Sequence, residues 1–310
     1  MDARISVVIN TLNEERNLPY ALRSVAPWAD EIVVVDMHSD DRTAAIAREY
    51  GARVFLHERM GFADPARAFA IAQAMGEWVL LLDADELIPP ALAARMRAVA
   101  QEDDADGINF PRLNYWVGSP LMYTCAGPDQ DKQMRFFKRS MAQISGTVHD
   151  FLMTLPGAHI LDLSYRCDGA IVHFAYLDVA HILEKFNRYS TIEAKQSFAG
   201  GRGQPPAWAL REVHAYPLLP ALFRRWQATP RSAAIFGLLI FVNRYLKNGG
   251  YRDGWRGFYI SLIMAGYFLA SYAKLAEMES VGGQEEIDAR YRAEAERILA
   301  GYLPATSVEE

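Results

Sequence analysis

The first half of the chain alternates between short apolar runs and segments whose apolar residues recur at helical spacing. The apolar runs predict four strands: Ile5–Ile9, Glu31–Val35, Arg53–Leu56 and Val79–Leu82. Helices are predicted between these strands, at Leu18–Val25, Thr43–Tyr50 and Gly61–Met75. This β-α-β-α-β-α-β order predicts an α/β fold with a mostly parallel sheet flanked by helices and with right-handed crossovers.

The last of these strands ends abruptly in carboxylates, at Asp83, Asp85 and Glu86. A continuous apolar run is typical of a strand buried on both faces, so charges at its end must be solvated or neutralised. Ligands bind at the carboxyl ends of strands in open α/β sheets, and a divalent cation with phosphate ligands would hold such charges together. The alternative is a strand that simply exits into a polar loop.

Polar residues also follow the first two strands, at Thr11, Asn13, Glu14 and Asp36. Because the carboxyl ends of parallel strands share one edge of the sheet, Thr11, Asp36 and Asp85 are expected to line one crevice. The Asp36 carboxylate can accept a hydrogen bond from a base or ribose. The sequence has neither the Gly-rich dinucleotide fingerprint nor the P-loop motif, so a bound diphosphate would be held by a metal, with Asp85 as its ligand.

Composition narrows the class of protein. With 51% hydrophobic residues among 310, the chain is not largely disordered, and a net charge of -6 argues against nucleic acid as a partner. Cys125 and Cys167 make neither a disulfide framework nor a zinc site. The amino terminus enters the first strand without an apolar leader, so the catalytic part is expected in the cytoplasm.

The C-terminal third has a different composition. A helix at Asp178–Phe198 is followed by the linker Gly200–Pro206, which predicts a catalytic domain at 1–199 and a helical region at 200–310. The apolar runs Ala233–Tyr245 and Gly257–Tyr272 are shorter than the roughly 20 clean residues of a spanning helix, and basic and aromatic residues flank them. We expect helices seated peripherally on an anionic membrane surface. Burial of the same helices in a homodimer is the alternative, and both arrangements can coexist.

Three motifs occur in the order and spacing of a known family: S-V-V-I-N-T-L-N-E-E-R-N-L, E-I-V-V-V-D-M-H-S-D-D-R-T and G-E-W-V-L-L-L-D-A-D-E. They resemble family 2 of the GT-A glycosyltransferases. Within that family the chain looks most like the bacterial branch of lipopolysaccharide core β-1,4-glucosyltransferase-like proteins. The later stretch Y-L-K-N-G-G-Y-R-D-G-W-R-G-F resembles the same branch.

The resemblance implies a Rossmann-like GT-A domain and an inverting hexosyltransferase that requires Mg2+ or Mn2+. It implies a nucleotide-sugar donor, with UDP-glucose expected, and a cell-envelope glycan or glycolipid as acceptor. Donor contacts are implied for Thr11, Asn13, Glu14, Asp36, Arg67, Asp83, Ala84 and Asp85, and Asp85 is the implied metal ligand. Relatives commonly have Q-[RK]-N where this chain has Ala66-Arg67-Ala68, so the polar residues beside Arg67 are missing.

A general base is expected from the middle segment, which adds predicted strands at Gly107–Pro111 and Met134–Phe137. A sugar hydroxyl that attacks an anomeric carbon loses its proton to a carboxylate within hydrogen-bond reach. Asp150 lies where the branch usually has V-H-E and is the expected base, with Asp129 as the second candidate. The alternative is that His149 and Asp150 form only a structural polar pair.

Several other residues of this segment have two candidate roles. Arg135 either binds an anionic acceptor group or braces the D-x-D loop by ion pairing. Tyr115 and Trp116 either stack on a sugar face or belong to the core, and His149 is assigned to the acceptor side. His173 is either a core histidine or, as this fold permits, a ligand of the metal or diphosphate.

Two other functions fit the same residues. Without the Q-[RK]-N residues, the chain can be a nucleotide-sugar-binding protein that performs no turnover. The second alternative is transfer to a polyprenyl phosphate. That reaction needs no base, because the phosphate is already ionised.

Overall fold

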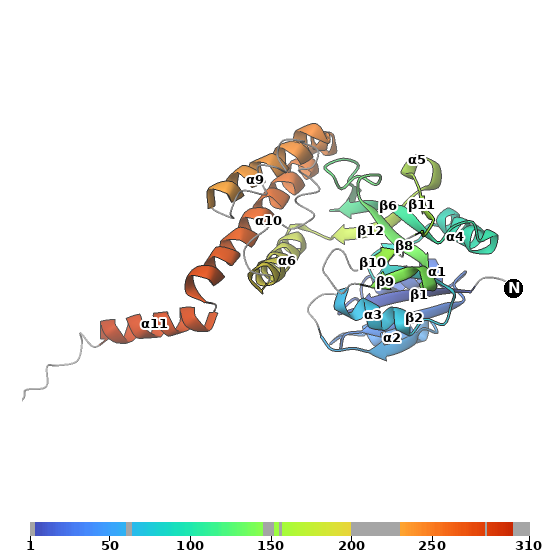
Figure 1. Cartoon of the computed structure of the whole chain (residues 1–310), viewed down its shortest axis with the longest axis horizontal. Coiled ribbons are helices and arrows are strands. Elements are labelled where there is room, and N and C mark those ends of the chain that lie inside the picture. Colours follow the sequence, from blue (N-terminus) through green and yellow to red (C-terminus); the bar gives the residue numbers. More distant parts are fainter. Residues whose placement is uncertain are drawn as a thin grey trace, which may run out of the picture. The chain divides into compact units, whose positions relative to one another are not determined.

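The computed structural model describes residues 4–59, 64–144, 152–154, 157–199, 230–282 and 284–299. The chain divides into two compact units. The sheet unit is Met1–Val179 with Asn248–Phe258, and the helical unit is Ala180–Lys247 with Tyr259–Glu310. All described strands belong to the sheet unit, and the described part of the helical unit is built from helices (Figure 1).

The sheet unit opens with the predicted alternation of strands and helices. Its first strands are β1 (Ile5–Thr11), β2 (Glu31–Asp36), β3 (Arg53–Leu56) and β4 (Trp78–Asp83). The helices between them are α1 (Leu18–Val25), α2 (Thr43–Glu49) and α3 (Asp64–Ala72). Strand β1 pairs in parallel with β2 and β4, and β2 pairs in parallel with β3, which confirms the predicted α/β fold. The first residues of the predicted helix Gly61–Met75 lie outside the described residues.

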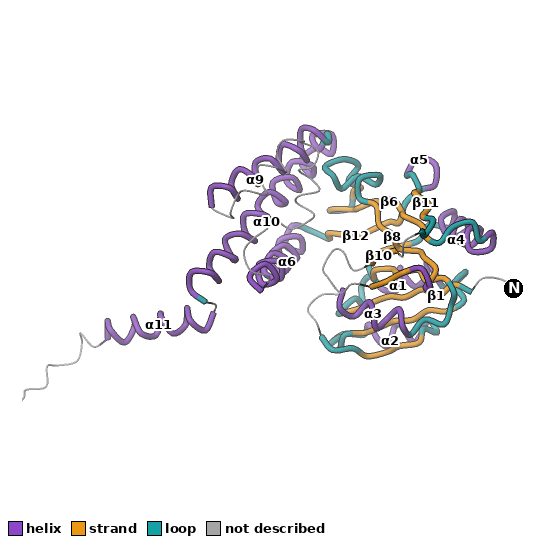
Figure 2. Tube along the Cα trace, in the orientation of Figure 1, coloured by secondary structure: helices purple, strands orange, loops and turns teal. Residues whose placement is uncertain are grey.

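The rest of the sheet unit widens the sheet. Its strands are β5 (Glu86–Leu87), β6 (Gly107–Trp116), β7 (Ser119–Pro120), β8 (Lys132–Lys138), β11 (Ile160–Asp162) and β12 (Ile171–Tyr176), with the pair β9 (Ala142–Ile144) and β10 (Leu152–Thr154) apart. Helices α4 (Pro90–Glu102) and α5 (Tyr165–Asp168) complete it. The strand order is β3-β2-β1-β4-β8-β6-β12-β5, so β4 lies inside the sheet. Figure 2 draws the strands in orange, with β1, β6 and β12 among those labelled.

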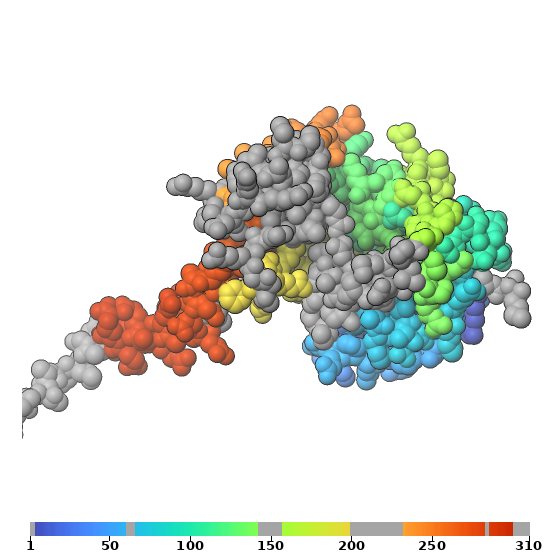
Figure 3. Space-filling model, viewed as in Figure 1, coloured from blue at the N-terminus to red at the C-terminus, as the bar shows by residue number. Residues whose placement is uncertain are grey.

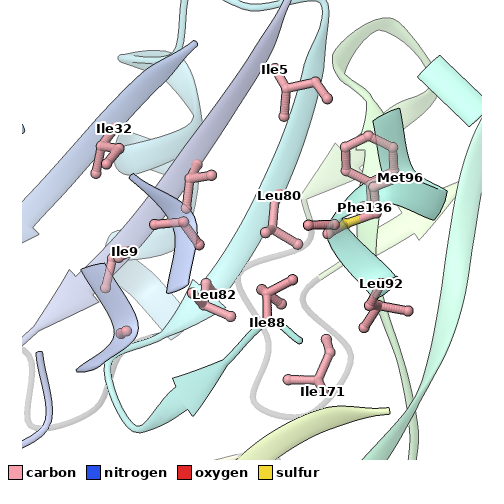
Figure 4. Packing of buried hydrophobic residues seen from close by; sticks show 14 of the residues in the cluster. Ile5, Ile9, Ile32, Leu80, Leu82, Ile88, Leu92, Met96, Phe136 and Ile171 are labelled. Carbon is pink, nitrogen blue, oxygen red and sulfur yellow. The ribbon is translucent and has the colours of Figure 1, made fainter. Parts of the chain in front are cut away.

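Alternate side chains of the central strands pack against helices on the two faces of the sheet. On one face, Ile9, Leu80 and Leu82 belong to a cluster with Leu92 and Met96 of α4, as Figure 4 shows. The cluster on the other face has α3 residues packed against β1, β2 and β4. A strand covered on both faces has no polar side to its sequence, which is why β4 reads as an unbroken apolar run.

The helical unit contains α6 (Val179–Ala199), α9 (Pro230–Val242), α10 (Gly254–Val281) and α11 (Gln284–Leu299), of which α10 begins in the sheet unit. The space-filling view colours α10 and α11 orange to red (Figure 3). Helix α10 is longer than the predicted run Gly257–Tyr272. The stretch Gly250–Val281 is long and apolar enough to cross a membrane by length and composition, a test that the core helix of a soluble protein also passes.

Each unit combines segments that are distant in the sequence, and the predicted domain boundary at residue 199 stays a prediction. Helix α6 belongs to the helical unit, where Lys274 Nζ of α10 donates to the Asn187 carbonyl at 2.7 Å. The 3-10 turn Gly250–Asp253 belongs to the sheet unit, because the Asp253 carboxylate accepts backbone N–H bonds from Met122 and Tyr123 at 3.0 and 2.9 Å. Long-range hydrogen bonds thus connect distant segments within each unit.

Candidate active site

Three polar loops meet at one edge of the sheet, as the strand pattern predicts. Thr11 lies opposite Asp36 across β1 and β2, and Asn10 lies opposite Asp83 across β1 and β4. Glu14 follows in the loop after β1 and is half-buried. The carboxyl ends of the three strands therefore lie side by side, where ligands bind in open α/β sheets.

The loops that follow β1 and β2 are hydrogen-bonded to each other. Asp36 is 2% exposed, and its carboxylate accepts bonds from the hydroxyls of Thr11, at 3.1 Å, and Ser39. Asn13 has a left-handed backbone, with φ of 57°, and its side-chain oxygen accepts the Asp40 N–H at 2.8 Å. These bonds fix the shape of the edge, and contacts of Thr11, Asn13 and Asp36 with a nucleotide remain predictions.

The Asp83 carboxylate lies between two guanidiniums. Arg67 and Arg135 each approach one of its oxygens at 2.6 Å, and these arginines are only 6% and 2% exposed. Burial would raise the pKa of Asp83, but Arg135 and Arg67 outweigh it and hold that pKa well below the ordinary 3.8. Arg135 thus forms the ion pair with the D-x-D loop that one of its two predicted roles requires, and its contact with the acceptor stays a prediction.

Two strands and a helix bring these three side chains together. Asp83 shares a face of the sheet with Leu81 of its own strand. Arg135 lies at a register irregularity of β8, where Ile108 pairs with Phe136 and Asn109 pairs with Met134. Arg67 reaches the same face from α3, which packs there through Ala70. Side chains from α3, β4 and β8 therefore meet in one ion-pair cluster.

Glu86 is a second carboxylate that arginine neutralises. It is fully buried, accepts the Asp83 N–H at 3.0 Å, and lies 3.4 Å from Arg112 and 3.6 Å from Arg135. Arg112 also binds both oxygens of Asp131, at 2.9 and 3.2 Å. The expectation that a cation would hold Asp83, Asp85 and Glu86 together therefore needs correction, because arginines compensate the first and the last.

Asp85 faces His173 across the turn that follows β4. His173 Nε2 lies 3.5 Å from Asp85 Oδ2, and the two side chains are 14% and 13% exposed. The register of β12 places them, because His173 lies opposite Glu86 of β5 and opposite Asn114 of β6. The Phe174 N–H also donates to the Asp85 carbonyl at 2.9 Å. The two predicted metal ligands are thus brought together.

Asp85 and His173 fit a divalent cation. Carboxylate oxygen and imidazole nitrogen are donors that Mn2+ accepts, and their 3.5 Å separation is less than twice a metal–ligand bond of about 2.1 Å. No group of three or more His, Cys, Asp or Glu residues converges within the described ranges. Diphosphate oxygens and water would complete the coordination, as is usual for Mg2+. Ala84 is 4% exposed, and its contact with a donor stays a prediction.

Among the described residues, this network contains three guanidiniums and four carboxylates: Arg67, Arg112 and Arg135 with Asp83, Asp85, Glu86 and Asp131. The arginines contact Asp83, Glu86 and Asp131, whereas Asp85 contacts His173.

The acceptor side is less fully described. Asp150 and His149 lie outside the described residues. Asp129 is exposed, and its Oδ1 accepts the Tyr165 N–H at 2.8 Å. This hydrogen bond connects the Asp129 side chain to the backbone at the start of α5.

The two candidate stacking residues differ in exposure. Trp116 is fully buried, with its ring centroid 5.5 Å from that of Trp255, so it belongs to the core. Tyr115 is half-buried and meets Phe174 edge-on, at 5.6 Å between centroids. Of the two, Tyr115 keeps a surface for a ligand.

Sequence reasoning missed Arg112, Asn114 and Asp131. Arg112 and Asn114 are two residues apart on β6, so strand alternation alone puts them on one face. Nothing in the sequence relates Asp131 to them, because the contact depends on how the loop before β8 returns to β6.

Replacing Asp83 by Asn should leave two buried guanidiniums without its charge and lower the free energy of unfolding by about 3–5 kcal/mol at neutral pH. Because the folded-state pKa is depressed, the stabilisation by Asp83 is present above 3.8 and is lost as pH falls through the folded pKa. The difference between wild type and Asp83→Asn in urea unfolding should therefore narrow below about pH 4.

The matched control is Asp162→Asn. Asp162 is an exposed carboxylate, 2.6 Å from Lys132, and its loss should cost only about 0–1 kcal/mol. An equal decrease in the free energy of unfolding of the two variants would contradict the claim that Asp83 neutralises two buried guanidiniums.

Comparison with known proteins gives a consistent result. Residues 6–154 match the family described as Glycosyl transferase family 2. The lipopolysaccharide core biosynthesis glycosyltransferase LpsC of Rhizobium meliloti (strain 1021) is 25% identical over 292 residues, covering 92% of this chain and 96% of LpsC. An uncharacterized glycosyltransferase of Rickettsia prowazekii (strain Madrid E) is 27% identical over 263 residues, covering 81% and 87%.

A solved structure shares the fold. Mannosyltransferase PcManGT from Pyrobaculum calidifontis, in complex with GDP-Man and Mn2+, superposes with a TM-score of 0.50 at 18% identity, covering 89% of this chain and 88% of that chain. The family match over residues 6–154 identifies the chain as a member of glycosyl transferase family 2, and therefore as a glycosyltransferase. The fold that it shares with the mannosyltransferase is GT-A-like.

Proposed function

We propose that the protein is a metal-dependent, inverting hexosyltransferase. It would move a hexose, with UDP-glucose as the proposed donor, onto a glycan or glycolipid of the cell envelope. The observation that carries the proposal is the Asp85–His173 pair, 3.5 Å apart at the carboxyl end of an inner strand. The relative LpsC, named for lipopolysaccharide core biosynthesis, supports this acceptor class.

The residues of the edge have distinct proposed roles. A divalent cation would stabilise the negative charge that grows on the diphosphate leaving group as the glycosidic bond breaks. Asp85 and His173 would hold that cation, and Thr11 and Asp36 would bind the base or ribose at the ends of β1 and β2. The arginine braces keep this edge rigid, so little reorganisation is needed during reaction.

Inversion also requires a base on the opposite face of the sugar. We assign this role to Asp150, which would remove the proton of the acceptor hydroxyl as the new bond forms. Asp129 is the weaker candidate, since its carboxylate already accepts the Tyr165 N–H.

The proposed location is the inner face of the cytoplasmic membrane, where lipid-linked acceptors are made. Large apolar side chains of the helical unit are exposed: Ile235, Leu238, Leu246, Tyr259, Leu262 and Leu269. The exposed Lys247 follows α9 and suits an anionic surface.

Asp85→Ala should lower sugar transfer at least about 100-fold, because the developing diphosphate charge loses its counter-ion. The measurement is release of nucleoside diphosphate from a panel of nucleotide sugars with Mn2+, alongside circular dichroism to confirm folding. Asp162→Ala, on an exposed carboxylate paired with Lys132, is the control and should keep wild-type turnover. Near-normal turnover in Asp85→Ala would rule out the proposed metal role, and a wild type that binds donors without any turnover would favour a binding protein.

Asp150→Asn should reduce kcat strongly while leaving the KM for the donor nearly unchanged, because a base acts on the acceptor rather than on donor binding. A change in donor KM alone would remove Asp150 from this role. Activity of Asp150→Ala that persists with a polyprenyl phosphate acceptor would favour transfer to that lipid.

Flotation with anionic vesicles tests the location. The wild type should float with vesicles rich in phosphatidylserine at low salt, and Leu238→Glu together with Leu262→Glu should reduce the floating fraction several-fold. Glu286→Gln, on an exposed charged helix, serves as the control. Equal flotation by wild type and the double variant would contradict the membrane assignment, and a dimer that dissociates in the double variant would assign the apolar surface to a second copy.

A further inference from the structure

The side chain of Asn114 joins His173 to a buried ion pair. Its amide nitrogen donates to the Ala126 carbonyl at 3.0 Å and to Asp131 at 2.7 Å. Its amide oxygen lies 2.6 Å from His173 Nδ1. Asn114 is 4% exposed, so protein groups rather than water satisfy this amide.

These contacts permit one orientation of the Asn114 amide. The Ala126 carbonyl has no proton to donate. Asp131 is likewise only an acceptor, because Arg112 holds the Asp131 pKa low against the opposing effect of burial. The amide nitrogen must therefore face these two groups, and the amide oxygen must face His173. Since that oxygen can only accept, the proton of the contact belongs to His173 Nδ1.

The position of this proton decides what the other ring nitrogen can do. A neutral imidazole carries one N–H, so a proton on Nδ1 leaves a lone pair on Nε2. That lone pair faces Asp85 Oδ2 at 3.5 Å. Two acceptors that face each other repel unless a cation lies between them. A metal-ligating histidine is usually fixed in this way by a hydrogen bond to its other nitrogen.

We propose that Asn114 is a positioning residue that fixes His173 in the Nδ1-protonated tautomer and thereby prepares Nε2 to bind a divalent cation together with Asp85. Asn114 does not touch the metal and acts only through the ring. Arg112 holds Asp131 by two hydrogen bonds, and Asp131 accepts a hydrogen bond from the Asn114 amide nitrogen. The Arg112–Asp131 pair thereby sets the orientation of the Asn114 amide. This inference rests on the metal role in the proposed function.

The first experiment determines the tautomer in the unaltered full-length protein. Ring-15N histidine labelling at about pH 8.5, where an ordinary imidazole is neutral, should show His173 with a protonated Nδ1 and an unprotonated Nε2. The His173→Gln variant assigns its signals among the seven histidines. A proton on Nε2 in the wild type would overturn the proposal, and this readout does not depend on the folding of any Asn114 variant.

The second experiment measures binding of Mn2+ alone, from the electron paramagnetic resonance signal of the free ion. Asn114→Leu should weaken binding by about 10–100-fold, and should have no further effect in the His173→Gln background. Gln133→Leu is the matched control, because Gln133 donates to Asp131 at 3.1 Å, and its affinity for Mn2+ should match the wild type.

The outcomes separate the two claims. A Kd for Asn114→Leu within twofold of the wild type, or an equal loss in both histidine backgrounds, would refute the positioning role while leaving the metal site intact. A wild-type protein that binds no Mn2+ would instead remove the proposed metal role, and the positioning role with it.

Discussion

The site depends on the neutralisation of two carboxylates at the end of β4, the half-buried Asp83 and the buried Glu86, by arginine. Asp83 and Glu86 are held by Arg67, Arg112 and Arg135. Such pairs contribute little net stability, because the cost of desolvation offsets their attraction, but breaking one is expensive. Their effect is to fix the turn that carries Asp85. Arginines thus compensate two of the three acids after β4, and the third, Asp85, contacts His173.

Hydrogen bonds from a segment that is distant in the sequence also support the site. Asp253 accepts the N–H groups of Met122 and Tyr123, and the following loop supplies the Ala126 carbonyl that orients Asn114. A segment after residue 248 thus supports the histidine side of the site, although it follows a long helical insertion. The stretch around Asp253, which resembles the family branch, therefore belongs to the sheet unit. Its neighbours in the sequence are helices of the other unit.

Much of this edge could be predicted from the sequence, because parallel strands buried on both faces read as apolar runs and their polar ends must meet. That reasoning placed the carboxyl ends of β1, β2 and β4 correctly on one edge, while the crevice expected between Thr11, Asp36 and Asp85 stays a prediction. It gave ion pairing of Arg135 with the D-x-D loop as one of two roles, but it did not predict that Arg67 would also contact Asp83. Arg67 and Arg135 are 16 and 52 residues away from Asp83 and meet it only in the folded chain. Asn114 was missed for a related reason, because the pairing of β6 with β12 is a property of topology.

The central claim is that Asp85 and His173 share a divalent cation. A crystal of the full-length protein soaked in Mn2+ and recorded at a wavelength with strong manganese anomalous scattering tests it most directly. The account predicts an anomalous peak in contact with both Asp85 Oδ2 and His173 Nε2, while His173 Nδ1 stays bonded to Asn114. A clear map with no peak between these atoms, or with an arginine side chain filling the gap, would contradict it.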